Sequence, residues 1–329
     1  MVLVVDAVLL AVGVLALWIG ARLLVTGASR LAGAAGVSAL VVGLTVVAFG
    51  TSAPEFAVSL EAAFAGQGDV SIGNVVGSNL FNLGVILGLV GILSPFRVTE
   101  TLVRRDALAM ATATAVAALV LLNGAVSRLE GAILLALLGG YLGALGIAIR
   151  TASRADGGRL DAAGDGVTVP PLAPDEGVPR EIQPTLEGGR VLVGLLLVIG
   201  GGRVLIDSAV GLALAVGISE WAVGATIVAT GTSLPELVTS VVAVRRGDVG
   251  IAAGNVVGSN VFNALGVLGL VAVVQPTAVD PAVFLGIAWL CVLTAFATVV
   301  LATGRRLTRL EGLGLVALGA GYWVVSVAL

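Results

Sequence analysis

The chain has 329 residues, of which 58% are hydrophobic and 11% are charged, and its 17 basic and 20 acidic residues give a net charge of −3. A water-soluble domain carries about a quarter charged residues, so this composition excludes a soluble globular protein and predicts a membrane protein. The basic residues are all arginine, histidine is absent and Cys291 is the only cysteine, which excludes a basic nucleic-acid surface, a Ser-His-Asp hydrolase, a disulfide framework and a cysteine metal cage.

Apolar runs follow one another along most of the chain, and each approaches the roughly 20 residues that a helix needs to cross a bilayer. Ten such runs lie at residues 3–25, 38–65, 70–93, 107–123, 129–149, 190–211, 219–244, 249–274, 281–302 and 308–328. The first run has no basic segment before it, carries Asp6 and has a counterpart later in the chain, so we interpret it as a span and not as a signal peptide. The sequence therefore predicts an all-α membrane protein with ten transmembrane helices.

The two ends of the chain are duplicates joined by a hydrophilic stretch. Residues 150–189 are rich in Gly, Pro and Asp and predict a flexible linker between residues 1–149 and residues 190–329. Two motifs align when an offset of 181 is added to each residue number of the first half. GTSAPE, beginning at Gly50, aligns with GTSLPE, and GNVVGSNLFN, beginning at Gly73, aligns with GNVVGSNVFN. Because five spans is an odd number, the second half must cross the membrane in the opposite direction. Such inverted five-helix repeats are a hallmark of secondary transporters.

The distribution of arginine predicts the orientation, since cytoplasmic loops carry an excess of basic residues. If both termini lie outside, fourteen arginines fall in cytoplasmic loops: Arg30, Arg97, Arg104, Arg105, Arg150, Arg154, Arg159, Arg180, Arg190, Arg245, Arg246, Arg305, Arg306 and Arg309. The opposite loops contain only Arg128. We therefore expect a multi-pass protein of the cell membrane with both termini outside and the linker in the cytoplasm.

Two carboxylates lie in the middle of apolar runs, where a charge costs several kcal/mol and marks a functional candidate. Glu55 and Glu236 each follow a proline, Pro54 or Pro235, which removes a helical hydrogen bond and clashes with the preceding turn. We therefore expect helices 2 and 7 to be discontinuous. Unwound backbone is tolerated in a membrane only where it is buried in protein or lines a cavity, and carbonyl, hydroxyl and carboxylate oxygens together are what Ca²⁺ requires.

Helical spacing places further polar groups beside these carboxylates. Four stripes share this spacing: Ala48, Thr51, Ser52 and Glu55; Ala229, Thr232, Ser233 and Glu236; Asn74, Ser78 and Asn82; and Asn255, Ser259 and Asn263. A pseudo-twofold axis between the halves can bring all four stripes together at the midplane. The spacing of Gly73 to Gly77, and of Gly254 to Gly258, also predicts close helix approach.

Structural interpretations compete with this ion site. Ser52-x-x-Glu55 and Ser233-x-x-Glu236 match a capping box, a role that can coexist with ion binding; we favour an ion site because the motif occurs twice in the membrane. Asn82 and Asn263 can instead serve only as hydrogen-bonding groups between helices. That is also the role expected for Asn74, Asn79, Asn255 and Asn260.

Two motif pairs carry a family resemblance. AFGTSAPE with GNVVGSNLFN in the first half, and ATGTSLPE with GNVVGSNVFN in the second, resemble the two alpha repeats of the prokaryotic sodium/calcium exchanger family within the cation/Ca²⁺ exchanger superfamily. The resemblance covers both membrane halves and implies ten helices, with the sites formed by helices 2, 3, 7 and 8. It implies that Glu55 and Glu236 are the central Ca²⁺ carboxylates and that backbone oxygens of Thr51 and Thr232 complete that site.

The resemblance also implies flanking Na⁺ sites. One would use Ala48, Ser52 and Ser259, the other Ala229, Ser233 and Ser78, and Asn82 and Asn263 would line the middle position. Many Na⁺-coupled relatives carry Asp where this chain has Asn263, so the coupling ion and the stoichiometry stay open.

The resulting hypothesis is a secondary antiporter that exchanges Ca²⁺ for Na⁺ by alternating access, with helices 1 and 6 as the moving elements. Two bare carboxylates cannot remain charged in a low-dielectric site, so another cation must replace each departing Ca²⁺. A Ca²⁺/H⁺ antiporter is the main alternative and a passive cation channel is a further one, whereas a membrane enzyme lacks a nucleophile and base. We expect inorganic cations and the bilayer as partners, with no cofactor, no nucleic acid and no obligate protein partner.

Overall fold

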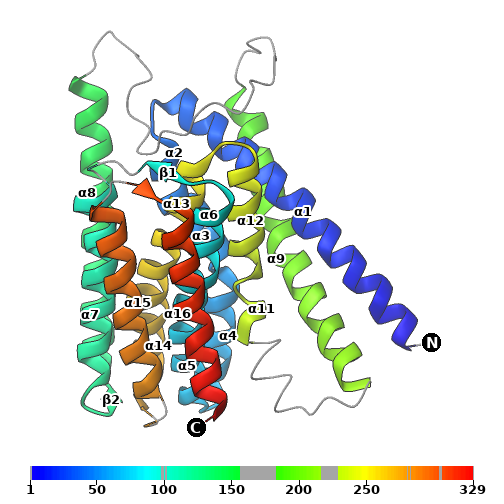
Figure 1. Cartoon of the computed structure of the whole chain (residues 1–329), viewed down its shortest axis with the longest axis vertical. Helices are drawn as coiled ribbons and strands as arrows, with labels where there is room; N and C mark the ends of the chain where they lie inside the picture. The colour runs from blue at the N-terminus through cyan, green and yellow to red at the C-terminus, as the bar shows by residue number, and fades with distance from the viewer. Residues whose placement is uncertain are drawn as a thin grey trace.

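The chain folds into a bundle of apolar helices (Figure 1). The computed structural model describes residues 2–97, 100, 102–155, 183–215, 229–279, 281, 283–303 and 306–328. Most of the predicted linker and the start of the predicted seventh span, residues 219–228, lie outside these residues. The linker and the division into two five-helix repeats therefore stay predictions.

The first half begins with the longest helix that the structure describes and continues with shorter, interrupted ones. Its α-helices are α1 (Val2–Ala35), α2 (Ala39–Val42), α3 (Ala48–Thr51), α4 (Ala53–Phe64), α5 (Gly68–Phe81), α6 (Gly88–Leu93), α7 (Leu108–Leu121) and α8 (Arg128–Ala155). Wider π-helical turns continue three of these helices: η1 (Gly43–Val47), η2 (Asn82–Leu87) and η3 (Leu102–Ala107).

The second half begins with α9. Its described helices are α9 (Pro184–Ala215), α11 (Ala229–Gly231), α12 (Leu234–Arg245), α13 (Val249–Val261), η5 (Phe262–Val267), α14 (Leu268–Val274), α15 (Val283–Thr303) and α16 (Arg309–Ala328). Gly66 and Gly247, which the offset of 181 equates, have φ angles of 73° and 82° in the turns before α5 and α13. A left-handed backbone of this kind favours glycine.

Within the described residues, six helices are long and apolar enough to cross a membrane, or seven spans if a bent pair is counted as one. That pair consists of residues 39–51 and residues 53–64, which meet at Ser52 with a bend of 41°. Several apolar helices of membrane-spanning length are therefore observed, as predicted, and so is the predicted discontinuity in the second span. The count of ten helices stays a prediction.

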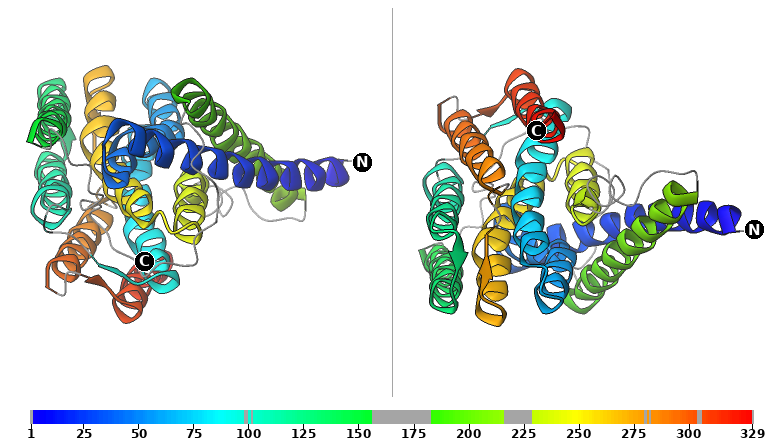
Figure 2. Two further views of the ribbon diagram at one scale, coloured as in Figure 1. Left: turned by 90° about the horizontal axis from the view of Figure 1, so that it is seen from above. Right: turned by 90° about the horizontal axis from the view of Figure 1, so that it is seen from below.

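Helices α1 and α9 lie side by side and lean away from the rest of the bundle (Figures 1 and 2). Glycines bring their backbones close, since a Cβ added to Gly20 would lie 2.9 Å from the Gly194 carbonyl, and one added to Gly201 would lie 3.0 Å from the Gly13 carbonyl. Small residues at such crossings maximise van der Waals contact between helices in a membrane, where helix association gains little from the hydrophobic effect.

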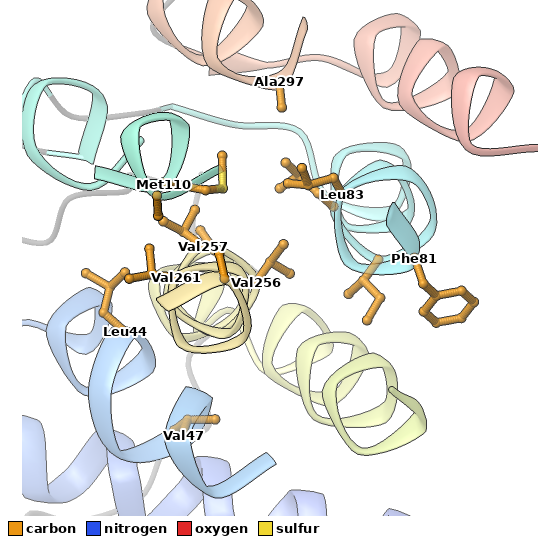
Figure 3. Close-up of a cluster of buried hydrophobic side chains, with 14 of the residues drawn as sticks. Leu44, Val47, Phe81, Leu83, Met110, Val256, Val257, Val261 and Ala297 are labelled. Atoms are coloured by element: carbon orange, nitrogen blue, oxygen red, sulfur yellow. The ribbon is translucent and has the colours of Figure 1, made fainter. Parts of the chain in front are cut away.

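The centre of the bundle holds α5 and α13 with their π-helical continuations. Figure 3 shows the apolar side chains packed there; Leu44, Val256, Val257 and Leu83 are among them. The close approach predicted for Gly254 and Gly258 is present, because an added Cβ would lie 2.4 Å from the Leu40 carbonyl and 2.6 Å from the Leu44 carbonyl, respectively.

Among the described residues, an added Cβ on Gly73 or Gly77 would meet nothing within 4 Å, so the approach predicted for these two glycines stays a prediction. The segment equivalent to residues 40–44 is residues 221–225, which lie outside the described part of the chain.

Two short antiparallel ladders tie the halves together at opposite ends of the bundle. Strand β1 (Phe96–Arg97) pairs with β4 (Arg306–Leu307), and β2 (Ala125–Val126) pairs with β3 (Thr277–Ala278). Figure 1 labels β1 near one end and β2 near the other. The all-α prediction did not include these ladders, because two-residue strands in loops between spans have no periodicity that a sequence can display.

Candidate cation-binding site

The two broken helices begin again immediately before the buried glutamates. Helix α3 ends at Thr51 and α4 begins at Ala53, while Ser52 between them has φ −79° and ψ 3°. Ser233 interrupts α11 and α12 in the same way, with φ −90° and ψ 6°. Pro54 has no N–H to donate to the Gly50 carbonyl, so the local sequence imposes this break.

Glu55 and Glu236 lie in the first turns of α4 and α12, and both are 0% exposed. They are close enough for their charges to repel each other. The Ser233 hydroxyl donates to Glu55 Oε1 at 3.0 Å, and the Ser52 hydroxyl donates to Glu236 Oε1 at 3.0 Å. Each carboxylate is therefore held by the serine of the other half.

This geometry does not support the capping interpretation for the two serine side chains. Neither Ser52 nor Ser233 makes a side-chain capping bond to its own helix. True capping boxes occur elsewhere, where Glu130 accepts from the backbone N–H and the hydroxyl of Ser127 at 2.8 and 2.7 Å. The same pair recurs 181 residues later as Thr308 and Glu311, at 2.7 Å for both bonds.

Several buried oxygens of the predicted site have no hydrogen-bond partner among the described residues. They are the second carboxylate oxygens of Glu55 and Glu236, the hydroxyls of Ser78 and Ser259, and the side-chain amides of Asn82 and Asn263. All six side chains are 0% exposed. Ser78 lies beside Glu55 and Ser259 beside Glu236, although neither hydroxyl has a hydrogen bond of good geometry among the described residues.

This concentration of unsatisfied groups is unusual, because the large majority of buried polar side-chain atoms have a hydrogen-bond partner. The unsatisfied oxygens belong to a carboxylate, a hydroxyl and an amide from each half, which is the ligand chemistry of a hard cation. The residues present therefore fit a cation bound between the halves.

The threonines of the predicted set use their hydroxyls in hydrogen bonds between the halves. Thr51 Oγ1 donates to Asn255 Oδ1 at 3.0 Å, and Thr232 Oγ1 donates to Asn74 Oδ1 at 3.3 Å. The resemblance assigned only their backbone oxygens to the ion, and these bonds leave that assignment open.

The two alanines of the predicted set differ in what the structure describes. Ala48 is buried, and its carbonyl accepts the Ser52 N–H at 3.0 Å and the Thr51 hydroxyl at 3.4 Å, so this oxygen already has two partners in the protein. Ala229 is the first residue of α11, and its side chain lies outside the described part of the chain.

Asn74 and Asn255 have the interhelical role predicted for them. The Asn74 amide donates to the Glu55 carbonyl at 3.4 Å and to Ser59 Oγ at 3.0 Å. Asn255 makes the equivalent bonds to the Glu236 carbonyl at 3.3 Å and to Ser240 Oγ at 3.0 Å. These amides fix the backbone that carries each glutamate.

The sequence interpretation missed the serines that complete this support. Ser59 and Ser240 each follow a buried glutamate by four residues, and the offset of 181 relates them. This regularity is a signal that was present in the sequence. Thr239 was also missed: its hydroxyl is buried without a partner among the described residues, and its equivalent in the first half is Val58, so symmetry offers no signal for it.

The two inner helices also contact each other directly. Asn79 donates to the Asn260 carbonyl at 3.3 Å, as expected for an interhelical group. The Asn260 amide instead donates to the Val256 carbonyl of its own helix α13 at 2.8 Å, so the interhelical bond predicted for this side chain is not observed among the described residues. Asn82 begins η2 and Asn263 lies in η5. Single π-helical turns are often found at functional sites.

Oxygen ligands gathered where helices break inside an apolar bundle define a class, the membrane proteins that bind and move hard cations. The profile of the family described as "Sodium/calcium exchanger protein" matches residues 5–146 and 188–328. This chain belongs to that family.

Relatives of known name agree with this membership. The inner membrane protein YrbG of Escherichia coli is 34% identical over 83% of this chain and 81% of its own length. The putative antiporter CaxA of Alkalimonas amylolytica is 31% identical over 94% of each chain. The sodium/calcium exchanger MaX1 of Methanosarcina acetivorans is 29% identical over 98% of each.

A solved structure has the same fold. The sodium-calcium exchanger NCX_Mj, soaked with 10 mM Na⁺ and zero Ca²⁺, superposes with a TM-score of 0.81 at 29% identity, covering 100% of this chain and 99% of that one. The present chain is therefore a multi-pass membrane protein with an exchanger fold.

Proposed function

We propose that this protein is a secondary antiporter that moves Ca²⁺ out of the cytoplasm in exchange for Na⁺ by alternating access. The observation that carries the proposal is the pair of fully buried glutamates, each with one oxygen free and each beside an unsatisfied serine hydroxyl. Membership of the exchanger family supports the same function.

Charge balance explains why exchange is obligatory. Two carboxylates neutralise one Ca²⁺, and no arginine forms an ion pair with either glutamate within the described residues. When Ca²⁺ leaves, two uncompensated charges in a low-dielectric site are costly, so Na⁺ or H⁺ must take its place before the site can move. Hydroxyl and carbonyl oxygens on both sides of the glutamates, from Ser52, Ser259, Ser233 and Ser78 among others, would hold Na⁺.

A specific residue favours Ca²⁺/H⁺ exchange as the second candidate. Asn263 is a neutral amide where many Na⁺-coupled relatives carry a carboxylate, so the site contains two acids rather than three. Two protons are enough to neutralise two acids. Na⁺ remains our first choice because the chain belongs to the sodium/calcium exchanger family. The free hydroxyls of Ser78 and Ser259 would also provide ligands for Na⁺ after Ca²⁺ has left, whereas protons on the two glutamates would not use them.

Transport by the purified protein separates these candidates. Liposomes that are tight to Ca²⁺ are loaded with Na⁺, or with acid, or with neither, and ⁴⁵Ca²⁺ uptake is measured with the membrane potential clamped. We expect uptake driven by the Na⁺ gradient alone. Uptake driven only by the proton gradient would assign the protein to the H⁺-coupled class, and uptake with no gradient would indicate a channel.

The Asn263→Asp variant tests the role of the missing carboxylate. A third acid adds one negative charge, so we expect the charge moved per Ca²⁺ and the Na⁺ dependence of uptake to change. Electrogenic current and ⁴⁵Ca²⁺ flux measured together give this ratio. An unchanged ratio and an unchanged Na⁺ dependence would mean that position 263 does not determine coupling.

The remaining parts of the proposal concern architecture. We infer ten transmembrane helices in two inverted repeats, residues 1–149 and 190–329, with both termini outside and residues 150–189 in the cytoplasm. The reciprocal bonds from Ser52 to Glu236 and from Ser233 to Glu55 support this symmetry. We further propose that the protein is not an enzyme and that it needs no cofactor or obligate protein partner for transport.

A further inference from the structure

The two strand ladders are equivalent in fold but opposite in chemistry. The offset of 181 converts the β1–β4 ladder into the β2–β3 ladder, because it relates Arg97 to Ala278 and Ala125 to Arg306. In the first ladder Arg97 stands directly opposite Arg306, and in the second Ala125 stands directly opposite Ala278. Two arginines therefore face each other at one end of the bundle, in positions that hold two alanines at the other.

The facing arginines have no acid to balance them among the described residues. Other arginines in this region are paired: Arg104 contacts Glu100 at 2.8 Å, and Arg105 contacts Asp106 at 2.7 Å. Arg97 and Arg306 are both exposed, and no hydrogen bond or ion pair joins either to a carboxylate in the part of the chain that the structure describes. Like charges directly opposite each other destabilise a ladder, so this pair favours an anion between its guanidinium groups.

The other pair of the same ladder anchors these arginines at the ends of two apolar helices. Phe96 and Leu307 face each other and are 2% and 0% exposed. Strand β1 follows α6 and β4 precedes α16. These two helices pack closely, since a Cβ on Gly88 would lie 2.9 Å from the Gly312 carbonyl. The arginines are therefore held at the level where the apolar surface of the bundle ends.

Exposed aliphatic side chains lie four to seven residues from the arginines in the sequence of both helices. Leu93 at the end of α6 is 46% exposed, and Leu310 and Leu313 in the first turns of α16 are 81% and 57% exposed. Arg309, also exposed, begins the same helix. A guanidinium pair above an aliphatic surface matches a molecule with a phosphate at one end and hydrocarbon chains at the other.

We propose that Arg97 and Arg306 bind the phosphate of an anionic phospholipid headgroup in the adjacent leaflet, with its acyl chains along α6 and α16. Free phosphate offers nothing for the aliphatic surface to contact, so the lipid is the ligand that uses both parts of the site. The opposite ladder, with Ala125 and Ala278, lacks the cationic half of this site. The proposal goes beyond ion exchange and does not depend on which ions are exchanged.

Native mass spectrometry of the full-length protein tests this proposal. The protein is released from vesicles of phosphatidylcholine with increasing phosphatidylglycerol, and the phosphatidylglycerol molecules retained per protein are counted. The double variant Arg97→Ala/Arg306→Ala, which copies the opposite ladder, is compared with the wild type. A basic residue near an anionic surface contributes about 1 kcal/mol, so we expect loss of one retained lipid and an apparent affinity lower by roughly 30-fold.

Matched variants separate a built site from general attraction. Arg245→Ala/Arg246→Ala removes the same charge from two other exposed arginines and should retain the lipid. Arg97→Lys/Arg306→Lys keeps the charge but not the fork of donors, and it should recover part of the retention. Circular dichroism establishes that each variant is folded.

Three results would overturn the proposal. Equal retention by the wild type and Arg97→Ala/Arg306→Ala would show that the arginines bind no lipid. Equal loss in Arg245→Ala/Arg246→Ala would show that only net charge matters. Full displacement of the lipid by millimolar inorganic phosphate or glycerol phosphate would show that the acyl chains add nothing and that the site is one for soluble phosphate.

Discussion

The functional chemistry of this protein depends on how single polar atoms are shared between its halves. Each buried glutamate accepts from the serine of the other half through one oxygen and keeps the other oxygen free. The serine orients the carboxylate without occupying both of its oxygens. A bound cation and the protein can therefore use the same carboxylate at the same time.

Replacing either glutamate with glutamine tests this arrangement. Glu55→Gln or Glu236→Gln keeps the shape of the side chain but removes one of the two charges that balance Ca²⁺, so we expect Ca²⁺ uptake to fall by at least about 100-fold, since a lost charge-assisted contact in a buried site costs roughly 3 kcal/mol or more. Uptake of ⁴⁵Ca²⁺ into liposomes measures the effect. Glu130→Gln, which alters a helix cap outside the site, serves as the control and should transport normally. Near-normal uptake by both site variants would disprove the assignment of the site.

At the level of elements, the helices that carry the glutamates are interrupted, whereas α1 and α9 are continuous and pack against each other. Proline and serine interrupt the helices that carry the glutamates, whereas glycines hold two uninterrupted helices together. The α1–α9 pair contains none of the predicted site residues, which is consistent with our proposal that these helices move past a stationary site.

Adjacent glycines of α9 provide a matched test of this packing. A Cβ on Gly201 would lie 2.8 Å from the Ala16 Cβ and 2.9 Å from the Leu17 nitrogen, while one on Gly200 would meet none of the described residues within 4 Å. Gly201→Ala should therefore lower the midpoint of thermal unfolding by about 2–6 °C, because overpacking costs roughly 1–3 kcal/mol. Gly200→Ala should leave it unchanged or raise it slightly, since alanine favours a helix. Fluorescence-monitored unfolding in detergent measures both, and equal midpoints would mean that α1 and α9 are not in close contact at Gly201.

For the whole molecule, the two ladders mark opposite ends of the bundle and so report its orientation. Ala125 in β2 and Arg306 in β4 are both exposed, and our proposed topology assigns them to the outside and the cytoplasm, respectively. In a Cys291→Ala background, Ala125→Cys should react with an impermeant maleimide in intact cells, and Arg306→Cys should react only after permeabilisation. The reverse pattern would mean that the orientation is inverted. Labelling of both cysteines in intact cells would contradict their placement on opposite sides of the membrane.

Much of the architecture and most of the proposed ligands were accessible from the sequence. Charges and prolines inside apolar runs mark Glu55 and Glu236 because the bilayer makes them costly, and duplication reinforces each signal. The strand ladders could not be predicted because two-residue strands have no periodic pattern. Thr239 could not be predicted because its equivalent in the first half, Val58, is apolar.

The sequence by itself determined which residues can bind a cation and where the helices must break, because burial of a charge and the missing N–H of proline are local constraints. Only the tertiary structure decided that Ser52 holds Glu236 rather than capping its own helix. It also decided which oxygens of the set stay unsatisfied. Both depend on distances between helices whose bonded residues are 178 and 184 residues apart in the chain. Helical periodicity specifies the face of a helix but not the neighbour that it meets.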